Sequence, residues 1–340
     1  MLLTTDSSVP RIVVTRTPLR VSFAGGGTDL PDYYNRDYGA VFSSAIDKYI
    51  YVTVKRHSEL FYEPIRVNYS ATEQANTIDE IKNNIARECL RFLHIDPPIY
   101  ISTVGDLPAS TGLGGSSAFS VGLLNALHGY RRERVSPGQL AEEASYIELE
   151  VLKEPIGKQD QYATAFGGLN YFRFNPGGAV TVEAVRRNGD YLADMFDHSL
   201  MFWTGMQRDA SSVLGEQRQN IPQKLAQLDA MRDHAAQLQQ LAQNGPFDPV
   251  GFGRILHESW RLKRELASTI STGAIDAYYE AAIRAGADGG KICGAGHGGF
   301  LLFIVRSERK AEVRRALSEL LEVPVRAEVH GSRVLLPAEH

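Results

Sequence analysis

Leu107-Pro108-Ala109-Ser110-Thr111-Gly112-Leu113-Gly114-Gly115-Ser116-Ser117-Ala118 says more about this chain than any other stretch. Three glycines and four hydroxyl residues lie after a proline and directly before an apolar helical pattern. Glycine reaches cheaply the dihedral angles with which a backbone curls its N–H groups around an anion. The helix that follows adds the positive end of its dipole. The stretch therefore predicts a phosphate-binding loop, with a nucleotide as the expected ligand.

The spacing within this loop excludes two common nucleotide-binding motifs. No Gly-Lys-Ser/Thr follows at the spacing of a Walker A loop, and the three glycines do not match G-x-G-x-x-G. A plain structural turn is the alternative reading of any such loop. Ser116 and Ser117 favour a ligand, because a hydroxyl at a helix start can cap the helix or bind Mg²⁺ beside phosphates, and the two roles are compatible.

Composition excludes several classes of function. A chain of 340 residues is long for a single core, so two domains are expected. A net charge of −4 provides no basic surface for nucleic acid or an anionic membrane, and no apolar run approaches the ~20 residues of a membrane span. The N-terminus lacks the features of a signal peptide, and Cys89 and Cys293 are too few for a disulfide framework. We therefore expect a cytoplasmic protein with reduced thiols that binds neither nucleic acid nor membrane.

Hydrophobic periodicity predicts intermixed strands and helices. Strands are expected at residues 11–23 with a break at Pro18, and at 46–55, 99–104, 167–174, 180–185, 300–305 and 325–329. Helices are expected at residues 76–93, 116–130 and 271–285, after Ser136, Pro222 and Asp248, and at 310–321. Because the two types do not alternate strictly, an α+β fold is favoured over a doubly wound sheet. A polar stretch within residues 187–200 indicates a seam between domains.

A second glycine cluster lies between a predicted helix and a predicted strand. Lys291–Phe300 contains four glycines within six residues, at 294, 296, 298 and 299, more than a simple turn needs. Close approach of the backbone, either to a ligand or to the first loop, would require them. His297 in this cluster is read as a surface residue rather than as a ligand or an acid–base group.

Five further residues carry charge where chemistry would need it. In Arg20-Val-Ser-Phe-Ala-Gly-Gly-Gly-Thr-Asp29 a predicted strand stops at three glycines. One interpretation is a turn with a capping Asp. In the other, Arg20 faces a negative centre and Asp29 accepts hydrogen bonds from substrate hydroxyls. Glu148 lies beside the apolar stripe of its helix, where a metal would supply the partner it needs. Asp160 follows a turn containing Pro and Gly, where Asp is also common for turn chemistry alone. Lys158 would lower the pKa of Asp160 or bind an anion.

Taken in this order, the clusters resemble the GHMP kinases, the galacto-, homoserine, mevalonate and phosphomevalonate kinase superfamily. The stretches that match the three family motifs are Thr17–Asp29, Leu107–Ala118 and Lys291–Phe300. Three further stretches look like the bacterial D-glycero-D-manno-heptose 7-phosphate kinases, a branch that grades into fucokinase-like and other sugar kinases. They are Ala24–Pro31, Gly157–Ala163 and His257–Lys263.

The resemblance implies the two-domain α+β fold of that family. An N-terminal domain similar to ribosomal protein S5 domain 2 is expected over residues 11–190, and a ferredoxin-like C-terminal domain over residues 195–335. ATP would lie between them. The oligomeric state is left open, with a homodimer as one alternative.

The resemblance also assigns roles to residues. Asp160 would face the accepting hydroxyl, as a base or as a positioning group, and Arg20 would lie near the transferred phosphate. Ser117 and Glu148 would hold Mg²⁺, with Ser116 as the alternative because Gly115 makes the loop one residue longer than is common. The other implied positions are Pro108, Gly112, Leu113, Gly114, Gly115, Ser116 and Ser117 for ATP; Gly26, Gly27, Thr28, Asp29 and Gln161 for the substrate; and Gly294, Gly296, Gly298 and Gly299 as a glycine-rich motif near the site. A 7-phosphate on the acceptor would require a second anion site away from the ATP loop. The candidates for it are Lys158, Arg208 and Lys263, with Lys291 as a weaker one, and a surface or salt-bridged role is the alternative for each.

The implied reaction is ATP- and Mg²⁺-dependent phosphorylation of the anomeric hydroxyl of D-glycero-D-manno-heptose 7-phosphate. Galactokinases carry Gly-Glu-His-Thr-Asp where this chain has Gly-Gly-Gly-Thr-Asp at 25–29, which argues against galactose as the acceptor. The alternatives are another sugar kinase of the superfamily, fucokinase-like or acting on a hexose, and a nucleotide-binding protein without catalysis. Ser117, Glu148 and Asp160 together argue against the last.

Overall fold

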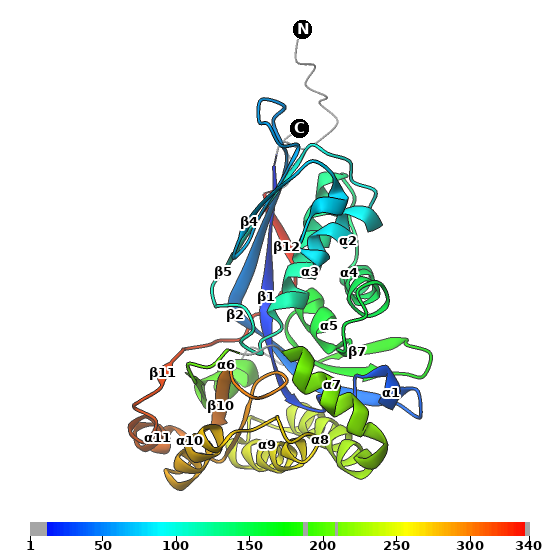
Figure 1. Cartoon of the computed structure of the whole chain (residues 1–340). Helices are drawn as coiled ribbons and strands as arrows, with labels where there is room; N and C mark the ends of the chain where they lie inside the picture. The colour runs from blue at the N-terminus through cyan, green and yellow to red at the C-terminus, as the bar shows by residue number, and fades with distance from the viewer. Residues whose placement is uncertain (1–11, 186–189, 208–209, 337–340) are drawn as a thin grey trace.

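The computed structural model describes residues 12–185, 190–207 and 210–336, arranged as two sheets with helices around them (Figure 1). The strands are β1 (Val13–Ala24), β2 (Gly39–Arg56), β3 (Ile65–Asn68), β4 (Thr72–Ala75), β5 (Ile99–Gly105), β6 (Leu169–Phe174), β7 (Val180–Ala184), β8 (Ser199–Trp203), β9 (Gly289–Ile292), β10 (Phe300–Ile304), β11 (Leu321–Glu322) and β12 (Arg333–Leu336). The helices are α1 (Pro31–Tyr34), α2 (Asn84–Phe92), α3 (Gly115–Tyr130), α4 (Pro137–Ser145), α5 (Gln159–Phe166), α6 (Asp190–Asp197), α7 (Ala210–Asn220), α8 (Leu225–Asn244), α9 (Pro249–Arg264), α10 (Gly273–Arg284) and α11 (Lys310–Ala316).

The larger sheet is organised around β2. This strand pairs antiparallel with β1 along most of its length, with β6 over its first part and with β5 over its second. β12 lies at the outer edge of β1, while β3 and β4 continue the sheet beyond β5. The prediction for residues 46–55 missed the first part of β2, because residues 39–46 are buried on both faces and so lack the alternation of a half-exposed strand.

Helices cover both faces of this sheet. α3 packs against β1 and β2 on the face that also carries α2, α4 and α5 (Figure 1), and α8 packs on β1, β2 and β6. The hydroxyl of Thr15 on β1 donates to the carbonyl of Gly122 within α3 at 2.8 Å. The helix that follows the glycine loop is therefore anchored on the centre of the sheet, which fixes the position of the loop.

The smaller sheet, in the order β11-β8-β10-β9, joins the larger one through a shared core. Alternate residues of β10 point to opposite faces, as the period of a strand requires. Phe300 and Leu302 belong to an apolar cluster that includes Phe23 of β1, whereas Leu301 and Phe303 belong to a second cluster beneath α10. The end of β1 and the smaller sheet are thus held together by buried side chains.

The structure confirms the α+β class and corrects three predicted elements. β1 runs past Pro18 without a break, and the irregularity there is a shift of register between Pro18 and Leu19. The helix predicted at 76–93 begins only at Asn84, where the side chain of Asn83 caps it by accepting from the Ala86 N–H at 2.9 Å. Residues 325–329 form a single bridge from Ala327 to Ile46 instead of a strand.

None of the helices in the described ranges is both long enough and apolar enough to cross a membrane.

Candidate active site

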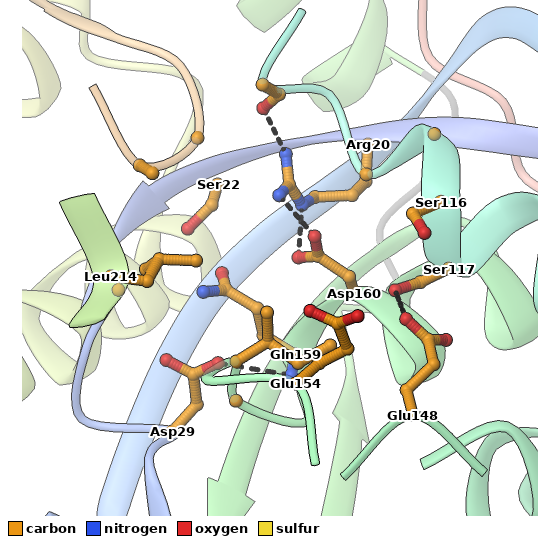
Figure 2. A pocket seen from close by; sticks show the side chains of 18 of the residues that line it. Arg20, Ser22, Asp29, Ser116, Ser117, Glu148, Glu154, Gln159, Asp160 and Leu214 are labelled. Atoms are coloured by element: carbon orange, nitrogen blue, oxygen red, sulfur yellow. Dashed lines mark hydrogen bonds and ion pairs between the residues drawn. The ribbon is translucent and has the colours of Figure 1, made fainter. Parts of the chain in front are cut away.

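A cavity of about 330 Å³ lies between the glycine loop, the end of β1 and the turn before α5 (Figure 2). Its wall is assembled from segments far apart in the sequence. It brings together these predicted site residues: Arg20, Gly26, Gly27, Asp29, Gly112, Gly114, Gly115, Ser116, Ser117, Glu148, Asp160, Lys263, Lys291 and Gly294.

The glycine loop ends as expected, at the start of a helix. Gly114 is the N-cap of α3 with φ 76°, in the left-handed region that favours glycine. The first N–H groups of a helix have no partners within it. Those of α3 lie at the cavity, where Gly115, Ser116 and Ser117 form part of the wall. The loop and the helix together therefore have the geometry that suits an anion.

The two glycine clusters lie against each other. A Cβ on Gly112 would lie 2.4 Å from the Cys293 carbonyl oxygen, and one on Gly299 would lie 2.3 Å from the Thr111 carbonyl oxygen. Gly294 would likewise collide with the backbone of Gly112. Gly294 and Gly299 therefore serve a close approach to the first loop, which confirms one of the two predicted reasons for the cluster. Gly296 and Gly298 instead approach the backbone of Ile270 and Met206.

This contact predicts that alanine substitutions at two glycines of the same loop will change the stability of the protein by different amounts. Gly112→Ala should lower the free energy of unfolding by about 2–3 kcal/mol, because its Cβ meets backbone and its φ is +82°. Gly115→Ala serves as the matched control and should change stability by less than about 1 kcal/mol, because nothing lies within 4 Å of its Cβ. Denaturant unfolding without nucleotide measures both. Equal free energies of unfolding for the two variants would mean that the first glycine loop and the second glycine cluster separate readily.

Arg20 and Asp160 form a two-point ion pair at the centre of the cavity. Arg20 Nε donates to Asp160 Oδ1 at 2.7 Å and Nη2 donates to Oδ2 at 2.6 Å, while Nη1 donates to the Gly112 carbonyl at 2.7 Å. The Arg20 side chain is 4% exposed and that of Asp160 is 24% exposed. The guanidinium therefore fixes the carboxylate from behind, and each Asp160 oxygen keeps a lone pair for a hydroxyl that enters the cavity.

Glu148 lies in a π-helical turn, Tyr146–Val151, of the kind often found at functional sites. The residue is buried, with Oε2 accepting from the Ser117 hydroxyl at 3.0 Å and Oε1 without a partner. Burial raises the pKa of Glu148 to about 8, against the lowering effects of Ser117 and Gln161. A carboxylate oxygen left unpaired beside a hydroxyl and an anion-binding loop suits Mg²⁺.

The described residues contain no group of three or more His, Cys, Asp or Glu side chains placed to enclose a metal. Mg²⁺ keeps several waters and uses one or two carboxylates together with substrate phosphates. Ser117 and Glu148 therefore fit such a metal, and Ser116 remains the alternative hydroxyl.

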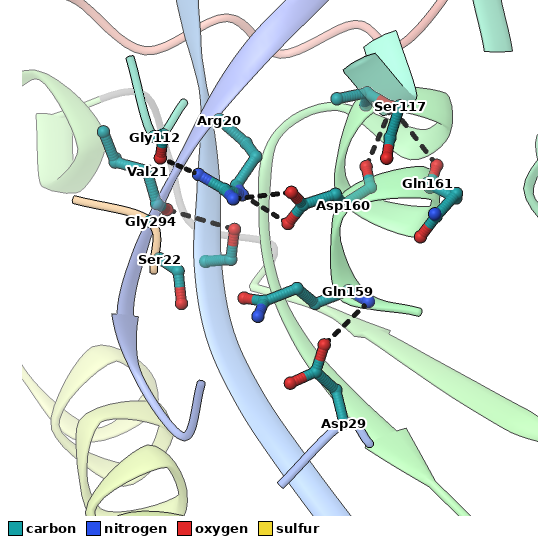
Figure 3. A network of polar contacts seen from close by, with 12 residues as sticks. Arg20, Val21, Ser22, Asp29, Gly112, Ser117, Gln159, Asp160, Gln161 and Gly294 are labelled. Carbon is teal, nitrogen blue, oxygen red and sulfur yellow. Dashed lines mark hydrogen bonds and ion pairs between the residues drawn. The ribbon is translucent and has the colours of Figure 1, made fainter. Parts of the chain in front are cut away.

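In Figure 2, Asp29 lies on the opposite side of the Arg20–Asp160 pair from Ser117 and Glu148. Its carboxylate accepts from the Gly27 N–H at 2.9 Å and from the Gln159 N–H at 3.3 Å. Burial raises the pKa of Asp29, and these backbone donors act against that shift. The Gln159 side chain lies between Asp29 and Asp160 (Figures 2 and 3), with its Oε1 unpaired. This side of the cavity is suited to bind hydroxyl groups.

Several predicted site residues lie outside the cavity wall. Thr28 is buried and donates to the Gly25 carbonyl at 2.7 Å. Lys158 donates to the Gly178 carbonyl at 2.8 Å and pairs with Glu142 at 3.2 Å, which differs from its expected role in binding the substrate. The others outside the wall are Pro108, Leu113, Gln161, Gly296, Gly298 and Gly299. Arg208 falls outside the residues that the structure describes.

The sequence did not indicate several polar residues of the wall. Ser22 and Gln159 lie within the predicted motifs, and that membership was the only signal that could have found them. Gln217 of α7 had none, because α7 reaches the cavity only through the tertiary fold. Ser22 Oγ and Gln217 Nε2 are buried without partners in the structure. They add unpaired polar atoms to the Asp29 side of the cavity.

Two family descriptions match this chain. Residues 76–168 match the GHMP kinases N terminal domain, and residues 236–323 match the GHMP kinases C terminal domain. Together these matches span more than half of the chain.

Individual relatives match along most of the chain. It is 28% identical over 318 residues to D-glycero-alpha-D-manno-heptose 7-phosphate kinase of Campylobacter jejuni, covering 90% of this chain and 93% of the relative. It is 26% identical over 348 residues to L-fucokinase/L-fucose-1-P guanylyltransferase of Bacteroides fragilis, covering 91% of this chain and 36% of that longer protein. A crystal structure of a D-glycero-D-manno-heptose 1-phosphate kinase from Bacteroides thetaiotaomicron aligns with a TM-score of 0.79 at 24% identity, over 95% of this chain and 99% of that one.

Proposed function

The chain belongs to the GHMP kinases, and we propose that it transfers the γ-phosphoryl group of ATP to the anomeric hydroxyl of D-glycero-D-manno-heptose 7-phosphate, giving the 1,7-bisphosphate. The observation that carries this proposal is the Asp160 carboxylate, fixed by Arg20 between the anion-binding loop and the Asp29 side of the cavity. That arrangement suits an enzyme that holds a phosphoryl donor on one side and a hydroxyl acceptor on the other.

The donor side is the loop and the first turn of α3. Its backbone N–H groups and the helix dipole would bind the phosphates of ATP. When bound there, Mg²⁺ would neutralise charge on the β- and γ-phosphates, and Ser117 and Glu148 are the residues that would hold it. The Arg20 guanidinium would offset charge on the moving phosphoryl group.

The acceptor side contains Asp29 and Asp160. Phosphoryl transfer through a loose transition state needs mainly positioning and charge stabilisation. Asp160 would accept a hydrogen bond from the anomeric hydroxyl, aim that oxygen at the donor and take its proton as the new bond forms. Asp29, with its oxygens held by backbone N–H groups, would accept a hydrogen bond from another hydroxyl of the sugar. The choice of a heptose phosphate rests on the Campylobacter jejuni relative.

The division into domains at residues 11–190 and 195–335, a cytoplasmic location and a homodimer stand as proposals beside the reaction.

A panel of acceptors tests the proposed reaction. With ATP and Mg²⁺, ADP release should be at least about 100-fold more efficient with the heptose 7-phosphate than with the unphosphorylated heptose, L-fucose or galactose. The physical reason is that a site built to bind a polar group is left with unpaired buried groups when the acceptor lacks it. Release without any acceptor provides the background. Turnover restricted to unphosphorylated sugars would reject the heptose phosphate and favour a fucokinase-like or hexose kinase.

A further inference from the structure

Two buried lysines lie in the cavity wall. Lys263 is near the end of α9 and is 5% exposed, and Lys291 is in β9 and is 4% exposed. Lys263 Nζ donates to the Gly294 carbonyl, and Lys291 Nζ donates to the Ser22 carbonyl at 2.6 Å. An ammonium group has three N–H donors, so each lysine keeps donors beyond its bond to the backbone.

Neither lysine has a carboxylate at salt-bridge distance among the residues that the structure describes. By contrast, the charge of Arg20 in the same cavity is paired with the carboxylate of Asp160. Burial of a charge without a partner is costly, and it lowers the pKa of Lys263 to about 8 and that of Lys291 to well below its ordinary value. Each lysine is therefore a buried amino group whose charged form an anion in the cavity would stabilise.

The buried Ser22 hydroxyl lies beside these groups and has no partner of its own. Its residue supplies the carbonyl that Lys291 binds, so the hydroxyl and the ammonium group belong to one small region. Two ammonium groups and a hydroxyl match a phosphate monoester, which carries nearly two negative charges and three acceptor oxygens. A carboxylate would supply one charge and two oxygens.

The lysines lie away from the first turn of α3, although Lys263 binds Gly294, which packs against Gly112 of the glycine loop. In Figure 2, Ser22 lies on one side of the Arg20–Asp160 pair, and Ser116, Ser117 and Glu148 lie on the other. Figure 3 places Gly294 and Ser22 together, across that pair from Ser117. The lysines are tied to Gly294 and Ser22, so an anion on them would lie across Asp160 from the first turn of α3.

We propose that Lys263 and Lys291, together with the Ser22 hydroxyl, form a subsite for the phosphate that the acceptor already carries before transfer. This proposal rests on the proposed function, and it names the residues that distinguish a sugar phosphate from a free sugar. Lys158, the other described lysine expected to bind the substrate, is held by Glu142 and Gly178 outside the cavity.

Substitution of each lysine tests the subsite. In Lys263→Met and Lys291→Met, the KM for the sugar phosphate should rise about 100-fold, because a buried cation that binds the phosphate is lost. The KM for ATP should stay within about threefold. Lys48→Met is the matched control, since Lys48 is a partly buried lysine paired with Asp47 outside the cavity. Thermal unfolding of each variant establishes that it is folded.

Inorganic phosphate provides a probe that does not depend on the identity of the sugar. It should inhibit the wild-type enzyme competitively against the acceptor, and this inhibition should weaken about 100-fold in either lysine variant. A rise in the KM for ATP with an unchanged KM for the acceptor would assign the lysines to the donor and overturn the subsite. Equal inhibition of wild type and variants by phosphate would overturn it as well. Preference of the wild type for an unphosphorylated sugar would instead reject the proposed function, and the phosphate inhibition would still decide the subsite.

Discussion

Replacing Asp160 with Asn is expected to lower kcat about 100- to 10,000-fold, while the KM for ATP changes by less than about threefold. The amide is nearly isosteric with the carboxylate, so the cavity keeps its shape. It cannot accept a proton from the hydroxyl, and its NH₂ group would face the Arg20 guanidinium, where the carboxylate now accepts hydrogen bonds of 2.6 and 2.7 Å. The variant therefore loses both the proton acceptor and the two-point contact that aims it.

Steady-state kinetics with ATP and the heptose 7-phosphate measures this effect. Asp288→Asn is the matched control, because Asp288 also pairs with an arginine, Arg306, at 3.0 Å, and it lies outside the cavity wall. That variant should keep a kcat within about twofold of the wild type. A kcat near the wild-type value in Asp160→Asn would remove Asp160 from the mechanism.

Replacing Glu148 with Gln is expected to impair catalysis and to stabilise the unliganded protein. The Mg²⁺ concentration for half-maximal turnover should rise at least about 100-fold, because the proposed metal loses its charged ligand. Titration of turnover with Mg²⁺ measures this effect. Glu150→Gln, two residues along the same segment at an exposed glutamate paired with Lys153, should leave the Mg²⁺ requirement unchanged. An unchanged requirement in Glu148→Gln would place the metal elsewhere.

The stabilising effect depends on pH in a definite direction. Burial raises the pKa of Glu148 from 4.5 to about 8, so the folded state favours the protonated carboxyl. The contribution of this protonated carboxyl to the free energy of unfolding is fully present below about pH 4.5 and is lost as the pH rises toward 8. Gln cannot ionise, so at pH 8 without nucleotide the variant should be more stable by on the order of 3 kcal/mol.

The difference should nearly vanish at pH 5, where Glu148 is protonated in the folded protein. Thermal unfolding at the two pH values, without Mg²⁺ or nucleotide, measures it. Equal stability of the variant and the wild type at pH 8 would mean that Glu148 already has a partner in the unliganded protein.

Features that depend on the local chain were predictable. The glycines before an apolar helical pattern predicted a loop that ends in a helix start, and α3 begins at Gly115 with Gly114 in the left-handed region. Backbone dihedral preferences and the helix dipole act within a few residues, so local sequence is enough to specify them. The order of the motifs likewise carried the family resemblance.

Contacts between distant segments were not predictable in the same way. Arg20 and Asp160 are 140 residues apart, and nothing in either motif specifies that they form a two-point pair. The same holds for Gly112 against Cys293 and for Gln217 in the cavity wall. Such contacts depend on the packing of distant elements, because α5 contributes to one buried cluster, the end of β1 to a second and α7 to a third.

The lysines illustrate the difference most clearly. Lys158, Lys263 and Lys291 look alike in the sequence, each close to a motif that carries chemistry. The fold pairs Lys158 with Glu142 outside the cavity and buries Lys263 and Lys291 without a carboxylate in the described part of the chain. The charge of a side chain is a property of its residue type, but its burial and its partner are set by the packing of distant segments. The glycine loop could therefore be predicted from the sequence alone, whereas the arrangement of the candidate acceptor site and the burial of its lysines required the tertiary structure.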